Sequence, residues 1–148
     1  MCIPKRLNAV SDSFVIQFYS NFHERFEDLS IEWDSYKISV FEDKTDEGPM
    51  TSNYSGKIVF FYPASVEQLN LSTDELIALF AHEIGHFVDS TGVDNYGNVK
   101  PSIEREYNAD DFAQNLGLGG ELLSGLQKIK AHFPIQPEDR LQRIEQHM

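Results

Sequence analysis

Residues 71–88 read LSTDELIALFAHEIGHFV, and this stretch decides the fold that we predict. Ser72 and Glu75 have the spacing of a capping box, in which each side chain accepts a hydrogen bond from the backbone of the other residue. We therefore predict a helix that begins after Ser72, runs to about Ser90 and stops at Gly92. Apolar residues cover most of its circumference, so the helix should be largely buried.

Inside this helix the segment HEIGH places His82 and His86 four residues apart. Side chains at this spacing lie on one face of a helix, so two imidazole nitrogens can reach one zinc ion. Glu83 lies beside that face, where its carboxylate can take a proton from a water that the zinc polarises. A solvated polar stripe is the alternative interpretation. The apolar neighbours disfavour it, because a buried glutamate without a partner is costly.

A catalytic zinc ion needs a third protein ligand, and the next predicted helix offers Glu106. Glu106 and Asp110 share one face with two alanines, whose small side chains would let the two helices approach closely. Asp110 could then accept a hydrogen bond from the free ring nitrogen of a ligand histidine. Glu104 is the competing ligand, but it is in helical register with Asn108 rather than with Asp110. A solvated acidic face is the non-functional interpretation of these carboxylates.

The rest of the chain predicts a single α+β domain over residues 1–148, with a small antiparallel sheet. Apolar residues recur at three- and four-residue steps in the predicted helices and alternate in the predicted strands. We expect, in chain order, a helix over 13–29, a strand over 36–41, a short edge strand over 53–56, a strand over 58–62 and, after the histidine-bearing helix, helices from 101 or 102 to 117, over 121–132 and from 137 onward.

The chain has 148 residues, with 24 acidic against 12 basic side chains and a formal net charge of −12. This charge repels phosphate backbones and anionic membrane surfaces, so we expect no nucleic acid partner, whereas basic or neutral peptides would be tolerated. The single cysteine, Cys2, cannot form an internal disulfide, and the sequence has neither an apolar signal region nor a transmembrane segment. These features predict a cytoplasmic protein.

The segments HEIGH at 82–86 and EYNAD at 106–110 resemble the paired motifs of the gluzincin metallopeptidases. They are most similar to the family of the CAAX prenyl proteases and heat-shock membrane proteases, whose small soluble members are the minigluzincins. The resemblance extends to residues 53–59, to Phe133-Pro134 and to residues 137–141, about two thirds of the chain. It implies a zincin-like fold, in which a small twisted sheet with an antiparallel edge and a backing helix lies over an active-site helix and a glutamate helix.

The predicted activity is zinc-dependent hydrolysis of peptide bonds by an endopeptidase. Zn²⁺ would be held by His82, His86 and Glu106, and Glu83 would be the general base. The resemblance further implies that a peptide or protein substrate binds as an added strand at the sheet edge.

The C-terminal signature of the family is present only in part, which leaves three candidates for stabilising the transition state: His132, Arg140 and Tyr96. Arg140 could equally be a helix-start residue without a catalytic role. Two other functions stay open. One is a latent form of the same enzyme, in which Cys2 or the C-terminal tail blocks the open zinc position. The other is a zinc-stabilised module that binds peptides without cutting them.

Overall fold

The structure is a computed structural model that describes residues 5–6, 24–25, 37–40, 49–53, 58–89, 103–132 and 138–146. Its elements follow in the order β1 (Lys5–Arg6), β2 (Lys37–Val40), β3 (Met50–Asn53), β4 (Ile58–Phe61), α2 (Pro63–Gln68), α3 (Thr73–Val88), α4 (Ile103–Asn115), α5 (Gly119–His132) and α6 (Glu138–Gln146). Strands precede these helices along the chain, so the predicted α+β class is confirmed.

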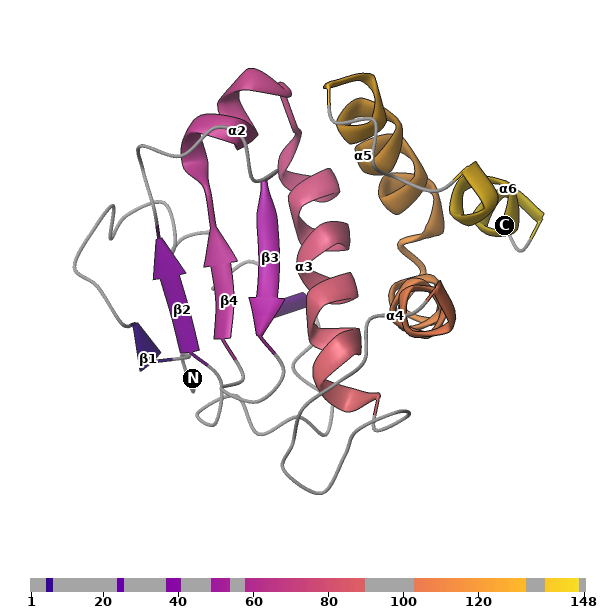
Figure 1. Cartoon of the computed structure of the whole chain (residues 1–148), viewed down its shortest axis with the longest axis horizontal. Helices are drawn as coiled ribbons and strands as arrows, with labels where there is room; N and C mark the ends of the chain where they lie inside the picture. Colours follow the sequence, from indigo (N-terminus) through magenta and orange to yellow (C-terminus); the bar gives the residue numbers. More distant parts are fainter. Residues whose placement is uncertain are drawn as a thin grey trace.

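The four described strands form one mixed sheet in the order β1-β2-β4-β3 (Figure 1). β3 pairs with β4 in the antiparallel direction, with Met50 opposite Phe61, so the predicted antiparallel edge is confirmed. The prediction of an antiparallel sheet throughout is wrong, because β1 with β2 and β2 with β4 pair in parallel. β3 and β4 are close together in the sequence, as antiparallel neighbours can be, whereas β2 and β4 are far enough apart in the sequence for a parallel pair.

The edge strand begins earlier in the chain than predicted. β3 covers Met50–Asn53, and residues 54–57 lie outside the described ones. Thr51 is the one residue of the segment that favours a strand, so its pairing with β4 and the burial of Met50 decide its conformation.

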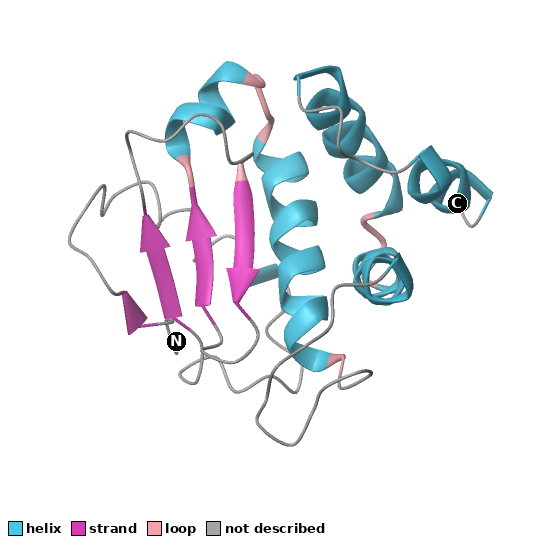
Figure 2. Ribbon diagram, in the orientation of Figure 1, coloured by secondary structure: helices cyan, strands magenta, loops and turns pink. Residues whose placement is uncertain are grey.

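Helix α3 begins as predicted. The hydroxyl of Ser72 accepts from the Glu75 N–H at 3.1 Å, and the Glu75 carboxylate accepts from the Ser72 N–H at 2.8 Å. The helix ends at Val88, and most of its residues are buried. The sheet lies on one side of α3, while α4, α5 and α6 lie on the other (Figure 2). Helix α3 is therefore the central element of the domain and carries the histidines into its interior.

The later helices agree with the prediction to within two residues, and α4 ends at a Schellman motif. Gly117 has a φ of +82°, its N–H bonds the Gln114 carbonyl, and the Leu118 N–H bonds the Ala113 carbonyl. Helix α2 was not predicted. Its signal in the sequence is Pro63, because proline favours the first turn of a helix.

The predicted backing helix over 13–29 lies outside the described residues except for Glu24 and Arg25, which are helical. Among the helices that the structure describes, none combines the length and the apolar character that a bilayer crossing requires.

Candidate metal site

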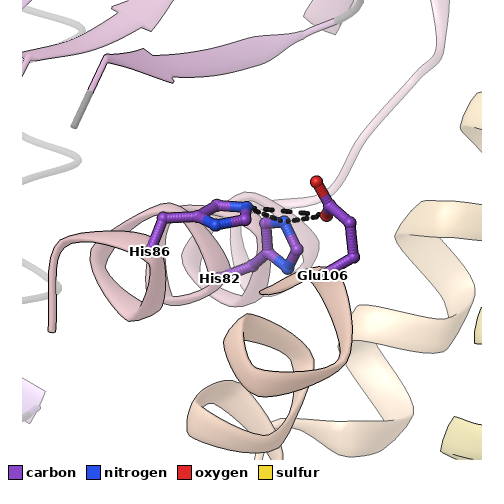
Figure 3. A group of neighbouring side chains, drawn as sticks. All are labelled: His82, His86 and Glu106. Carbon is purple, nitrogen blue, oxygen red and sulfur yellow. Dashed lines mark hydrogen bonds and ion pairs between the residues drawn. The ribbon is translucent and has the colours of Figure 1, made fainter. Parts of the chain in front are cut away.

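Three side chains from two helices meet in a cluster of potential metal ligands (Figure 3). His82 and His86 lie one turn apart on α3, and Glu106 reaches them from the first turns of α4. The two Nε2 atoms are 3.2 Å apart. Oε2 of Glu106 lies 3.1 Å from Nε2 of His82 and 3.5 Å from Nε2 of His86. Two nitrogen atoms and one oxygen atom thus form a nearly equilateral triangle.

The size of this triangle fits a zinc ion. Zinc binds imidazole nitrogen and carboxylate oxygen at about 2.0–2.2 Å in tetrahedral geometry, so neighbouring ligand atoms should be about 3.3–3.5 Å apart. The three observed separations are 3.1, 3.2 and 3.5 Å. The donor set, two imidazoles and one carboxylate, is also one that zinc uses in catalytic sites. The residues present therefore fit a zinc ion without rearrangement of the backbone.

Solvent exposure rises across the cluster from one ligand to the next. The side chain of His82 is 7% exposed, that of His86 is 15% exposed and that of Glu106 is 36% exposed. The cluster is therefore closed on the side of His82 and accessible on the side of Glu106. An accessible side is what a catalytic metal site needs for water and substrate, whereas a structural site is closed by a fourth protein ligand.

A second layer of polar side chains holds the buried histidine. Nδ1 of His82 donates to Oδ1 of Asp110 at 2.8 Å, so its Nε2 is the ring nitrogen that faces the cluster. Asp110 is itself held by Arg140 of α6, which donates from Nε at 3.0 Å and from a terminal nitrogen at 2.9 Å. Asp110 is fully buried and Arg140 is nearly so. Carboxylates in this position fix the orientation of a ligand histidine.

The electrostatics of the cluster suit a bound cation. Burial by itself would lower the pKa of His82, but its hydrogen bonds to Asp110 and Glu106 outweigh burial and raise the pKa to about 10. Burial would raise the pKa of both carboxyl groups, but their hydrogen bonds to His82 hold the pKa of Glu106 and of Asp110 well below the usual range. The ring of His82 thus lies between two carboxylates that favour a positive charge, and a metal cation would take the place of a proton on its Nε2.

The close approach of α3 and α4 depends on Gly85. A Cβ atom added there would lie 2.9 Å from Cα of Ala109 and 2.9 Å from Cβ of Phe112, distances that real Cβ atoms essentially never show. The alanines of α4 were predicted to allow this approach, but Gly85 was not. The sequence does contain a signal for Gly85. A glycine inside a helix costs about 1 kcal/mol relative to alanine, so its presence there indicates a close approach of another element.

Arg105 is a second residue that the sequence analysis missed. Its buried guanidinium donates to the carbonyl oxygens of His86 at 3.3 Å and Asp89 at 3.1 Å. These carbonyls belong to the last turn of α3, where no partner remains inside the helix. Arg105 therefore ties the end of α3 to the residue next to Glu106. Nothing in its sequence context distinguishes it from a solvated basic side chain.

The structure places the other predicted residues as follows. Glu83 is buried on α3, and its charge contributes to raising the pKa of both His82 and Arg140. Glu104 is exposed and is not part of the cluster, so Glu106 is the carboxylate that the structure brings to the histidines. His132 is exposed at the end of α5.

The remaining predicted residues, Tyr96 and Cys2, lie outside the described part of the chain. Comparisons of the chain with protein-family models, with curated proteins and with solved structures found no match. The geometry of the cluster is therefore the basis for a function.

Proposed function

We propose that this protein is a zinc metallopeptidase of the gluzincin type, with a zincin-like fold and endopeptidase activity. The observation that carries the proposal is the triangle of donor atoms from His82, His86 and Glu106, whose edges match a zinc tetrahedron and whose Glu106 side is accessible. Glu83, in the position next to the first histidine, supports hydrolysis rather than a purely structural role, because a structural zinc site has no use for a buried base beside it.

Each residue has a distinct task in peptide hydrolysis. When bound, the zinc ion supplies a Lewis acid that polarises water and the scissile carbonyl group. Glu83 takes the proton from the attacking water and delivers it to the amine that leaves. Asp110 keeps His82 oriented, so that its Nε2 and not its Nδ1 faces the metal.

The proposed substrate is an extended peptide that pairs with β3. In the described sheet β3 is an edge strand, and it packs against α3, which carries the cluster. The free backbone groups of an edge strand can pair with an added strand, a common mode of peptide recognition. The net charge of −12 favours basic or neutral peptides. The cytoplasmic location predicted from the sequence stays a prediction.

The metal content of purified protein tests the ligand set. We expect one zinc per chain in the wild type, prepared without a metal-affinity tag, and a large loss in His86→Ala and Glu106→Ala. Glu104→Ala is the matched control, because it removes an exposed carboxylate two residues from Glu106 and should leave the zinc content unchanged. Equal loss in both glutamate variants, or no zinc in the wild type, would overturn the assignment.

Cleavage of a peptide library tests the activity. Glu83→Gln keeps the size of the side chain but removes the base, so it should abolish cleavage while zinc stays bound. A zinc-stabilised module that binds peptides without cutting them would show no cleavage in the wild type and unchanged peptide binding in Glu83→Gln. A latent enzyme would cleave only after removal of the blocking segment or, if Cys2 is the block, in a Cys2→Ser variant.

A further inference from the structure

Arg140 faces the metal cluster from the first turn of α6, and its guanidinium is directed at carboxylates. Nε and one terminal nitrogen bind the two oxygens of Asp110, at 3.0 and 2.9 Å. The other terminal nitrogen lies 3.5 Å from Oε2 of Glu106, the oxygen that faces both histidines. All three guanidinium nitrogens thus face carboxylates of the cluster, and only 4% of the residue is exposed.

The positive charge of Arg140 offsets part of the negative charge of the cluster. Glu83, Glu106 and Asp110 contribute three negative charges, and the guanidinium of Arg140 contributes one positive charge. A charge of −2 remains, and one divalent cation would neutralise it. The pKa of Arg140 reflects this environment, because burial would lower it but Asp110, Glu106 and Glu83 together raise it.

On the basis of the proposed function, we propose that Arg140 is a positioning residue of the metal site. It acts through Asp110: the two parallel hydrogen bonds hold this carboxylate in one orientation, and Asp110 in turn holds the ring of His82. A planar guanidinium suits this task because two of its N–H groups point in parallel at the spacing of the two oxygens of a carboxylate. This role differs from the stabilisation of the transition state that the sequence suggested, and in it α6 completes the metal site although it supplies no ligand.

Arg143 provides a matched control one turn along the same helix. It also makes a two-point contact with a carboxylate of α4, at 2.6 and 2.8 Å from Asp111, and its guanidinium lies over the ring of Tyr107. Both arginines therefore attach α6 to α4, but only Arg140 is connected to the histidines. A loss of zinc affinity that came merely from loosening α6 would appear in variants of either arginine.

The experiment measures the zinc dissociation constant by competition with a chelator, together with the visible absorption spectrum of the cobalt-substituted protein. The variants are Arg140→Gln, Arg140→Lys, Arg143→Gln, Asp110→Asn and the double variant of Asp110→Asn with Arg140→Gln. Thermal unfolding and circular dichroism of each metal-free variant report whether it folds. Arg140→Lys retains the positive charge but lacks the paired N–H donors of a guanidinium. It therefore keeps the test decisive if Arg140→Gln does not fold.

We expect Arg140→Gln to weaken zinc binding by about 10- to 100-fold, the usual effect of losing an outer partner of a ligand histidine, and to change the cobalt spectrum. Arg140→Lys should lie between this variant and the wild type, and Arg143→Gln should bind zinc within about twofold of the wild type. In the Asp110→Asn background, the change of Arg140 should add less than about threefold, because residues that act through one contact are not additive.

The inference is overturned if Arg140→Gln binds zinc as the wild type does, if its effect multiplies fully with that of Asp110→Asn, or if Arg143→Gln weakens binding equally. A fall in kcat with unchanged zinc affinity would instead assign Arg140 to the transition state, which also overturns it. Each of these outcomes overturns only the role of Arg140 and leaves the proposed function intact. Wild-type protein without zinc would remove the proposed function and this inference together.

Discussion

Replacement of Gly85 by alanine tests whether the separation of α3 and α4 sets the geometry of the metal site. The added Cβ would lie 2.9 Å from Cα of Ala109 and 3.0 Å from its carbonyl oxygen. Carbon atoms in contact prefer about 3.5–4.0 Å, so α4 would have to move by at least about 0.6 Å. The atoms in the way belong mainly to the backbone of α4, so no side-chain rotation can relieve the clash.

Two opposing effects decide the change in stability. Overpacking a tight contact costs about 1–3 kcal/mol, while alanine in place of glycine inside a helix gains about 0.5–1 kcal/mol. We expect a net loss of about 1–2 kcal/mol, which lowers Tm by roughly 2–8 °C in a chain of this size. Glu106 lies one turn from Ala109, so the shift also widens the donor triangle by more than the tolerance of about 0.2 Å for metal–ligand distances. Zinc affinity should fall at least about tenfold, or about 1.4 kcal/mol.

The assay is a chelator competition for zinc combined with thermal unfolding of the metal-free protein. Gly125→Ala is the control, because a Cβ atom at Gly125 would meet only side-chain atoms, the nearest at 3.5 Å, an ordinary contact. Gly125→Ala should therefore keep the wild-type zinc affinity and raise Tm slightly. A Gly85→Ala protein with the Tm and zinc affinity of the wild type would refute the reasoning that this helix contact positions Glu106.

Three further outcomes are expected. Burial alone would raise the pKa of Glu75, but hydrogen bonds from Lys128, Ser124 and Ser72 lower it from 4.5 to about 2. Since the folded state has the lower pKa, this carboxylate contributes up to about 3 kcal/mol above pH 4.5, and the contribution is lost as the pH falls towards 2. Glu75→Gln should flatten this part of the acid unfolding curve and lower Tm at pH 7. Arg105→Met removes both hydrogen bonds to the last turn of α3 and should cost about 1–3 kcal/mol in thermal unfolding, whereas an unchanged Tm would show that the contact is dispensable. Zinc at 100 times its dissociation constant should add about 2.7 kcal/mol to the free energy of unfolding, and a chelator should reverse the gain; a Tm insensitive to both would contradict a specific site.

Most of the elements could be predicted because their signals are local. The capping box defined the start of α3, and Gly117 defined the end of α4. The pair His82 and His86 needed only the period of a helix to be placed on one face. The position of β3 and the existence of α2 were not predicted, because neither segment has a distinctive pattern. Pairing with β4 and packing against the core decide these two elements.

The sequence by itself determined which side chains could bind a metal. Two histidines four residues apart and a glutamate one helix later restrict the chemistry before any fold is known, since backbone geometry alone brings the histidines together. Helical register already favoured Glu106 over Glu104, but only the tertiary structure brought Glu106 to the histidines and directed Arg140 to Asp110. These choices depend on how closely and at what rotation one helix packs against another. That arrangement is set by contacts between residues distant in the chain, such as Gly85 with Ala109, which no local pattern encodes.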